Sequence, residues 1–199
     1  MEKKYFWRKT MKRLLVENML LKNHTFSLWI YFIGLFTLTI AATNASLIAW
    51  QFNYIISEKD FKGKIDKNSM FNANTSTSIK FKMSIQDTVK ANITAYFDKQ
   101  KSWMKPNTPE KVMAHERLHF DLTEIYAREI RKRIIEIKAT SFDKKTQSIQ
   151  ITYAYKFLVK KMAEEQALYD KESEHSVNSK KQLEWKNAIT KRLSSLQQY

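Results

Sequence analysis

The sequence predicts an α+β domain, with a small antiparallel sheet followed by one long helix and two further helices. Two observations indicate this class. Between residues 47 and 98, short runs of alternating or β-branched side chains are separated by turn residues, as in strands. From residue 108 onward the apolar side chains recur at helical spacing, and no proline or glycine follows Pro109. The strands are therefore expected first and the helices last.

Three segments are predicted to form the sheet. Residues 47–57 are rich in aromatic and β-branched side chains, which favour strands. A charged turn region around Gly63 follows this segment. Residues 76–84 and 89–98 alternate more regularly, and the second of them has three apolar side chains on one face: Ile93, Ala95 and Phe97.

Helices account for the rest of the chain. The first is expected from residue 108 to about 137, with Thr108 as N-cap and Pro109 in the first helical position. A loop of lysine, threonine and serine leads to a second helix at about 150–169, and a third spans about 178–197. Because every helix can bury an apolar face, the chain can build one core without disulfides, which it cannot form for lack of cysteine.

The faces of the first helix follow from a rotation of about 100° per residue. His115 and His119 share their face with apolar side chains and should point into the protein. These neighbours are Val112, Leu118, Leu122 and Tyr126. The opposite face is charged and is expected to be exposed to solvent. It carries Arg117, Asp121, Glu124, Arg128 and Arg131.

The strongest functional signal is the segment H-E-R-L-H at residues 115–119. Residues four apart on a helix lie one above the other, so both imidazoles can be directed at one metal ion. Two histidine ligands with a glutamate beside them are typical of zinc-dependent hydrolases. We therefore predict one Zn²⁺ held by His115 and His119, with Glu116 as the catalytic base. The alternative interpretation is a pair of core histidines satisfied by hydrogen bonds.

A catalytic zinc needs a third protein ligand, and the chain has no cysteine to supply it. Glu124 lies on the far side of the helix and is interpreted as a surface ion-pair residue. Asp121 is also off the ligand face, so it could act only by orienting a histidine. His175 follows the second helix, where composition alone favours an exposed loop histidine. Asp170 and Glu174 are the alternatives near it.

Several segments together resemble a known family. These are H-E-R-L-H-F-D-L-T-E-I-Y-A-R from residue 115, the preceding F-D-K-Q-K-S-W, the later Y-D-K-E-S-E-H and the final Q-L-E-W. They resemble the bacterial family of predicted secreted zinc-dependent proteases known as domain of unknown function 922. The resemblance extends from residue 47 to the C-terminus and includes the turn at residues 60–63. It implies a zincin-like metalloprotease domain over residues 46–199.

The resemblance also bears on the ligand set. Family members typically carry H-E-Q-x-H-F-D and a later Y-D-x-x-T-x-H, and the histidine of the later pattern corresponds to His175. The resemblance therefore implies His175 as the third metal ligand. Arg117 stands where glutamine is common and Ser173 where threonine is common, and neither change affects an expected ligand.

The first 45 residues have the sequence pattern of a signal peptide. A basic region precedes an uncharged apolar stretch at residues 26–42, and Ala45 is a suitable last residue before cleavage. An uncleaved membrane anchor is the alternative, because the stretch nearly reaches spanning length. Either interpretation places the domain outside the cytoplasm, as a secreted or periplasmic protein or as a membrane-anchored one.

Charge and motif together limit the function. Residues 46–199 carry 28 Lys and Arg against 18 Asp and Glu, a net charge of +10. A basic protein outside the cytoplasm can meet anionic envelope polymers, whereas the dispersed lysines and missing recognition motifs do not favour nucleic acid. The expected function is hydrolysis of a protein or peptide substrate, with Tyr169 as a candidate oxyanion donor. The alternatives are a metal-stabilised binding module without activity and a zinc amidase acting on cell-wall material.

Overall fold

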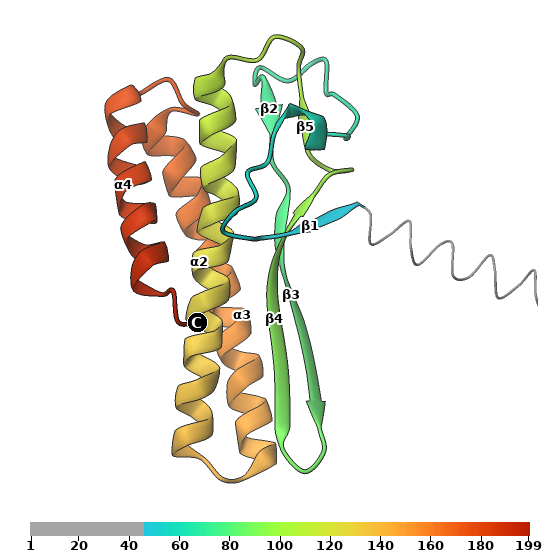
Figure 1. Cartoon of the computed structure of the whole chain (residues 1–199), viewed down its shortest axis with the longest axis vertical. Helices are drawn as coiled ribbons and strands as arrows, with labels where there is room; N and C mark the ends of the chain where they lie inside the picture. Colours follow the sequence, from blue (N-terminus) through green and yellow to red (C-terminus); the bar gives the residue numbers. More distant parts are fainter. Residues whose placement is uncertain (1–45) are drawn as a thin grey trace, which may run out of the picture. The chain divides into compact units, whose positions relative to one another are not determined.

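The structure is a computed structural model and describes residues 46–199; the predicted signal or anchor segment, residues 1–45, lies outside the described part. An antiparallel three-stranded sheet has the order β1–β4–β3, and a small antiparallel pair is formed by β2 and β5. Figure 1 shows β3 and β4 as one long hairpin. The strands are β1 (Leu47–Ala49), β2 (Ala73–Asn74), β3 (Thr77–Ile85), β4 (Val89–Asp98) and β5 (Trp103–Met104).

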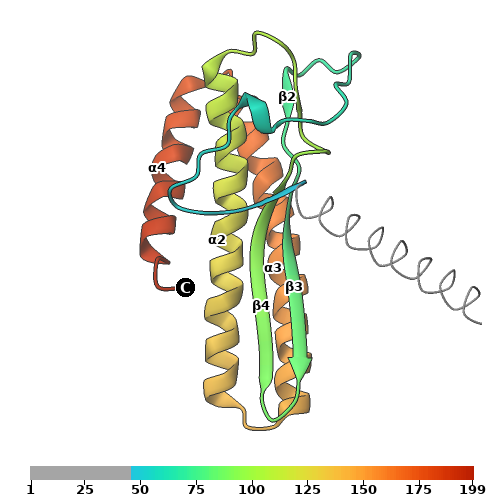
Figure 2. The same cartoon turned by 45° about the vertical axis from the view of Figure 1, so that its right-hand side comes forward.

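Three α-helices follow within residues 46–199. They are α2 (Glu110–Thr140), α3 (Lys144–Ser173) and α4 (Ser179–Ser195). Asp143 caps α3 by accepting a hydrogen bond from the Thr146 N–H, and Asn178 caps α4 by accepting one from the Lys181 N–H. In both views α2 lies between α4 and the β3–β4 hairpin, with α3 packed along it (Figures 1 and 2). The predicted α+β class with a small antiparallel sheet is confirmed, as are the three helices.

The hydrophobic core lies where α2 meets the sheet, α3 and α4. The face of β4 predicted to be apolar is buried, with Ala95 and Phe97 fully inaccessible to solvent. The opposite face of the hairpin carries exposed lysines, which explains the alternation in the sequence. From α2 the core receives Leu122, Ile125, Ala127 and Ile130. No helix in the described part of the chain is long and apolar enough to span a membrane.

The first predicted strand is mostly wrong. Only Leu47–Ala49 pair with β4, and the chain then turns away, with a short 3-10 helix, η1, at Glu58–Asp60. The reason is tertiary: the Trp50 N–H still donates to Ala95 O of β4, but its indole Nε1 donates to Asp121 on α2, at 2.8 Å, and the chain beyond it no longer pairs with the sheet. Trp50 also lies under the guanidinium of Arg128, 4.9 Å from the ring centre.

Two expectations for α2 are also corrected. The helix begins at Glu110 with Pro109 as its N-cap, while the Thr108 hydroxyl donates to the Lys105 carbonyl oxygen instead of capping. Glu124 is not a surface residue: it is buried and accepts hydrogen bonds from Arg128 and Arg131. The face predicted to be exposed is covered because α4 and the C-terminal residues pack over it, where Arg128 also donates to Leu193 O.

We expect Asp60→Asn to lower the free energy of unfolding at pH 7 by about 1.5–3 kcal/mol, because hydrogen bonds to a charged acceptor are lost. Asp60 is buried and accepts from Ser57 N and Ser57 Oγ. Burial alone would raise its pKa, but the Ser57 and Tyr54 hydrogen bonds and nearby Lys99 outweigh burial and hold the pKa below its ordinary value.

The lowered pKa of Asp60 determines how the difference in unfolding free energy between Asp60→Asn and wild type depends on pH. A carboxylate with a lower pKa in the folded state stabilises the protein above its unfolded pKa, about 3.9, and this stabilisation is lost as the pH falls further. Urea unfolding at pH 7 and pH 3 should therefore show a large difference between Asp60→Asn and wild type at pH 7 and a smaller one at pH 3. Equal stabilities at pH 7 would contradict this account of Asp60.

Candidate metal centre

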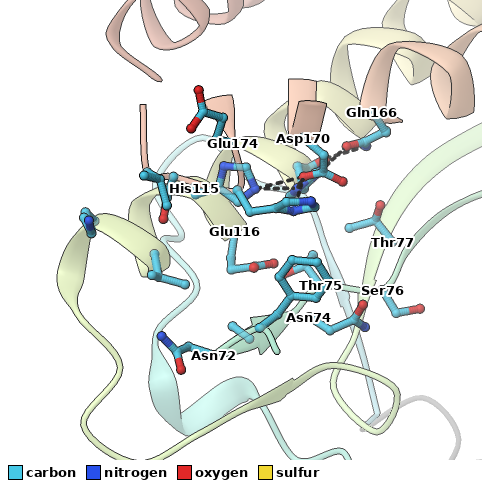
Figure 3. Close-up of a pocket in the computed structure, with 18 of the residues that line it drawn as sticks. Asn72, Asn74, Thr75, Ser76, Thr77, His115, Glu116, Gln166, Asp170 and Glu174 are labelled. Atoms are coloured by element: carbon cyan, nitrogen blue, oxygen red, sulfur yellow. Dashed lines mark hydrogen bonds and ion pairs between the residues drawn. The ribbon is translucent and has the colours of Figure 1, made fainter. Parts of the chain in front are cut away.

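A groove of about 950 Å³ contains the predicted site. Three parts of the chain line it: the first turns of α2, the C-terminal end of α3 with the residues after it, and the segment that contains β2. Figure 3 shows His115, Glu116 and Asp170 facing the segment from Asn72 to Thr77 across this groove. Residues about 50 positions apart in sequence thus share one hollow.

His115, His119 and Asp170 meet at the centre of this groove. The two Nε2 atoms lie 3.1 Å apart, and Asp170 Oδ1 lies 3.0 Å from His115 Nε2 and 2.9 Å from His119 Nε2. His115 is buried and comes from the second turn of α2, one turn before His119. Asp170 reaches both rings from the last turn of α3.

Glutamines from two other helices fix the orientation of both rings. His119 Nδ1 is hydrogen-bonded to Gln166 Oε1 on α3, and Gln166 Nε2 in turn donates to His119 O and Thr123 Oγ1. His115 Nδ1 lies 3.1 Å from Gln182 Oε1 on α4. An amide oxygen accepts, so each Nδ1 carries the proton and each neutral ring turns an unprotonated Nε2 toward Asp170.

The centre therefore brings together three acceptor atoms, two imidazole nitrogens and one carboxylate oxygen. Such atoms repel one another unless a proton or a cation lies between them. Burial disfavours charge on Asp170, but when no cation is present, protons on Nε2 of His115 and His119 hydrogen-bond to it, outweigh burial and hold the pKa of Asp170 well below its ordinary value. Burial likewise lowers the pKa of His119, yet Asp170 and the charge of Glu116 raise it overall. The cluster attracts positive charge.

His175 lies at the mouth of the groove, outside this triangle. Its Nδ1 is 3.5 Å from Asp170 Oδ1, and its side chain is 45% exposed. Its ring contacts that of Phe71 at a tilt of 43°, with centroids 4.2 Å apart. His115, Asp170 and His175 can each offer an atom within 4.8 Å of the others, so these three form a further possible donor set.

The carboxylates of Glu116 and Glu174 point in different directions. Glu116 is buried and lines the groove, and Figure 3 shows it between the cluster and the segment of Asn74 and Thr75. Glu174, considered with Asp170 as an alternative ligand, turns its carboxylate away from the cluster (Figure 3). Of the two alternatives, Asp170 is the one that meets the histidines.

The expectation that Tyr169 supplies an oxyanion donor is wrong. Tyr169 is fully buried, and its ring stacks on that of His115 with centroids 4.4 Å apart. Its hydroxyl lies 3.0 Å from Gln182 Oε1 and 3.3 Å from His115 O, so it does not reach the groove. Tyr169 instead supports the His115 ring from behind.

The sequence was compared with known families, curated proteins and solved structures. Residues 41–176 match the family described as bacterial proteins of unknown function, DUF922. The chain belongs to the DUF922 family. The comparisons with curated proteins and with solved structures found no match.

The DUF922 match contains every residue of the cluster and ends at Ser176, before α4. Gln182 therefore lies beyond the matched part although it contacts His115. Sequence reasoning missed Gln166 and Gln182 and gave Asp170 only as an alternative. One signal was available: Gln166, Asp170 and Ser173 recur at i, i+4 and i+7, which places polar side chains on one face of α3.

Backbone groups also face the groove of this DUF922 protein. The Lys105 N–H donates to Asn72 O at 2.7 Å, which makes Ala73 and Met104 a non-hydrogen-bonded pair in the β2–β5 ladder. Ala73 therefore directs its own N–H and C=O away from β5, to the free edge of β2. Since Ala73 lines the groove, this edge of β2 forms part of the groove wall.

Proposed function

We propose that this DUF922 protein is a zinc-dependent peptidase, with the metal held by His115, His119 and Asp170 and with Glu116 as general base. The observation that carries the proposal is the convergence of three acceptor atoms, 2.9–3.1 Å apart, beside a buried glutamate in an open groove. Ligands about 2.0–2.1 Å from a tetrahedral zinc lie about 3.3 Å from one another, close to these separations.

The donor set fits zinc. Two imidazole nitrogens and one carboxylate oxygen form a three-ligand set of the kind found at catalytic zinc, which leaves a position open for water or substrate. When bound, zinc acts as a Lewis acid that polarises a carbonyl group and makes water more acidic. His175 as a third ligand stays a prediction. Its ring lies at the mouth of the groove, and the shorter distances from Asp170 to the two histidines favour Asp170 as the third ligand.

The side chains of the site then have distinct roles. Glu116 accepts a proton from the attacking water at its carboxylate and returns it to the leaving amine. His175, half-exposed beside Asp170, donates from its ring to the carbonyl oxygen of the substrate as negative charge develops there. The free edge of β2 holds the substrate backbone in an extended conformation across the groove.

The buried position of Glu116 favours catalysis over the alternative of a metal-stabilised binding module. A purely structural zinc site needs no carboxylate beside its ligands. Burying a carboxylate such as that of Glu116 costs stability, which favours a functional role for it. Secretion or a periplasmic location, with or without a membrane anchor, remains a proposal from residues 1–45 of the sequence, as do contacts with anionic envelope polymers.

The direct test is incubation of the zinc-loaded protein with an unfolded polypeptide, followed by mass spectrometry of the products. We expect internal cleavage that stops when a chelator removes the metal and resumes when zinc is restored. Release of amine from purified cell-wall polymer, without cleavage of any polypeptide, would favour the amidase instead.

Gln182→Leu is expected to weaken zinc binding by about 10–100-fold, the usual effect of losing a hydrogen bond that orients a ligating histidine. The change removes the nearer acceptor of His115 Nδ1 and leaves it only the Ser173 hydroxyl, 3.4 Å away, so the tautomer and orientation of the ring are held less firmly. Competition with a chromogenic chelator measures the affinity. Gln147→Leu, at the far end of α3, is the matched control and should bind zinc as wild type does; equal affinities of all three proteins would contradict the role of Gln182.

A further inference from the structure

A second groove adjoins the candidate metal centre. Its volume is about 610 Å³, and it lies between the segment after β1, the outer side of α2 and the start of α4. Lys111 and Ser176 line both grooves, so the two hollows meet over the first turns of α2. A chain that lies across the metal centre can therefore continue into the second groove, here called the distal groove.

Ser176 marks the boundary between the two grooves. It is 2% exposed, and its Oγ has no hydrogen-bond partner among the described residues. Its φ of 77° continues a left-handed run that begins at Glu174, a conformation that is costly for residues other than glycine. A buried hydroxyl without a partner is itself unfavourable, and this one lies at the boundary that a ligand backbone crossing between the grooves would pass.

The rim of the distal groove is apolar and exposed. Phe52 is 91% exposed, Ile55 70% and Leu183 57%, and all three line the groove. None belongs to the core of the domain, so folding alone does not account for their position. Clustered exposed apolar side chains around a hollow are typical of binding surfaces.

The charges around the distal groove are mostly positive. Lys111 and Lys186 line it, and neither forms an ion pair with a described residue. Arg117 also lines it but is bound to Glu110, and the carboxylate of Asp121 is occupied by the indole of Trp50. The unpaired charge available to a ligand is therefore positive, which complements acidic groups.

From this geometry we propose that the distal groove is a second binding site for the polypeptide substrate. It takes a segment remote from the bond to be cleaved, one with apolar side chains for Phe52 and Ile55 and acidic side chains for Lys186. This inference rests on the proposed peptidase function, because the continuity of the two grooves is what identifies a polypeptide as the occupant. Long unfolded chains then bind better than short peptides.

The test measures binding without cleavage. The probe is a fluorescent 16-residue peptide of Leu, Phe and Glu, and a six-residue peptide of the same composition serves for comparison. The protein is the full chain with Glu116→Gln, which prevents cleavage of the peptides. Adding Phe52→Ser and Ile55→Ser should raise the Kd of the long peptide about tenfold, because two apolar contacts are lost. The short peptide should bind equally to both proteins.

The matched control is Phe142→Ser, which removes a side chain that is 96% exposed in the α2–α3 loop, away from both grooves. It should leave the Kd of the long peptide unchanged. Lys186→Gln should weaken binding of the long peptide, but it should not weaken binding of a long peptide that has Gln in place of Glu. Equal Kd values for the Phe52→Ser, Ile55→Ser protein and its parent would overturn the distal groove.

Failure of the distal groove and failure of the peptidase proposal give different results. With Glu116 restored, the Phe52→Ser, Ile55→Ser protein should cleave the six-residue peptide at the wild-type rate. If the proposal for the distal groove is wrong, cleavage persists and the long peptide binds this variant as tightly as it binds the parent protein. If the peptidase proposal is wrong, no protein cleaves either peptide, while the difference in binding of the long peptide remains.

Discussion

Glu116→Gln is expected to reduce kcat for peptide-bond cleavage by about 10²–10⁴-fold, the usual contribution of a positioned general base. Glutamine has the same shape but cannot accept the proton of the attacking water at neutral pH. Glu116 is not among the three converging ligand atoms, so zinc affinity should change little. The rates are measured with a quenched fluorescent peptide at saturating zinc, together with the bound zinc per chain.

Glu174→Gln is the matched control for this experiment. Glu174 lies at the same groove, but its carboxylate points away from the cluster (Figure 3), so its replacement should leave kcat close to the wild-type value. A Glu116→Gln protein that cleaves as fast as wild type would show that another group accepts the proton. Loss of activity with both variants would indicate a general charge effect instead of a base.

Asp170→Ala is expected to weaken zinc binding more than about 100-fold, beyond the usual effect of losing a group that only orients a ligand. Among the carboxylates of residues 46–199, only that of Asp170 hydrogen-bonds to both imidazole Nε2 atoms. In contrast, His175→Ala should leave zinc affinity within a few-fold of wild type and lower kcat, since His175 lies at the mouth. Isothermal titration of the metal-free proteins with zinc gives both affinities.

The same pair of variants distinguishes the two ligand sets. Loss of zinc in His175→Ala, with zinc retained in Asp170→Ala, would support the ligand set implied by the family resemblance and contradict the one proposed from the distances. Glu174→Ala should bind zinc normally and controls for the removal of negative charge near the groove.

Much of the fold is encoded in local patterns. The β3–β4 hairpin and the three helices were predicted because one buried face imposes a period of two or 3.6 on the sequence. The segment after Ala49 was mispredicted because aromatic and β-branched residues favour a strand, whereas Trp50 is drawn to Asp121 and Arg128 on α2. Such a contact between distant residues leaves no periodic signal.

The candidate site divides in the same way. His115, Glu116 and His119 lie within five residues, so helix geometry alone brings them together. Asp170 comes from another helix, and the predicted end of that helix at residue 169 placed it in a loop. The structure extends α3 to Ser173, which turns Asp170 toward the histidines. The exposure of Glu124 was mispredicted because the covering of α2 by α4 depends on tertiary packing.

Zinc content is the most direct test of the metal centre on which the proposed function depends. The full chain is dialysed against excess zinc and then against buffer, and bound zinc is measured by plasma mass spectrometry, beside a variant with His115→Ala and His119→Ala. The proposal predicts about one zinc per wild-type chain and none in the variant. A wild-type chain that retains no zinc, or a variant that retains as much as wild type, would contradict it.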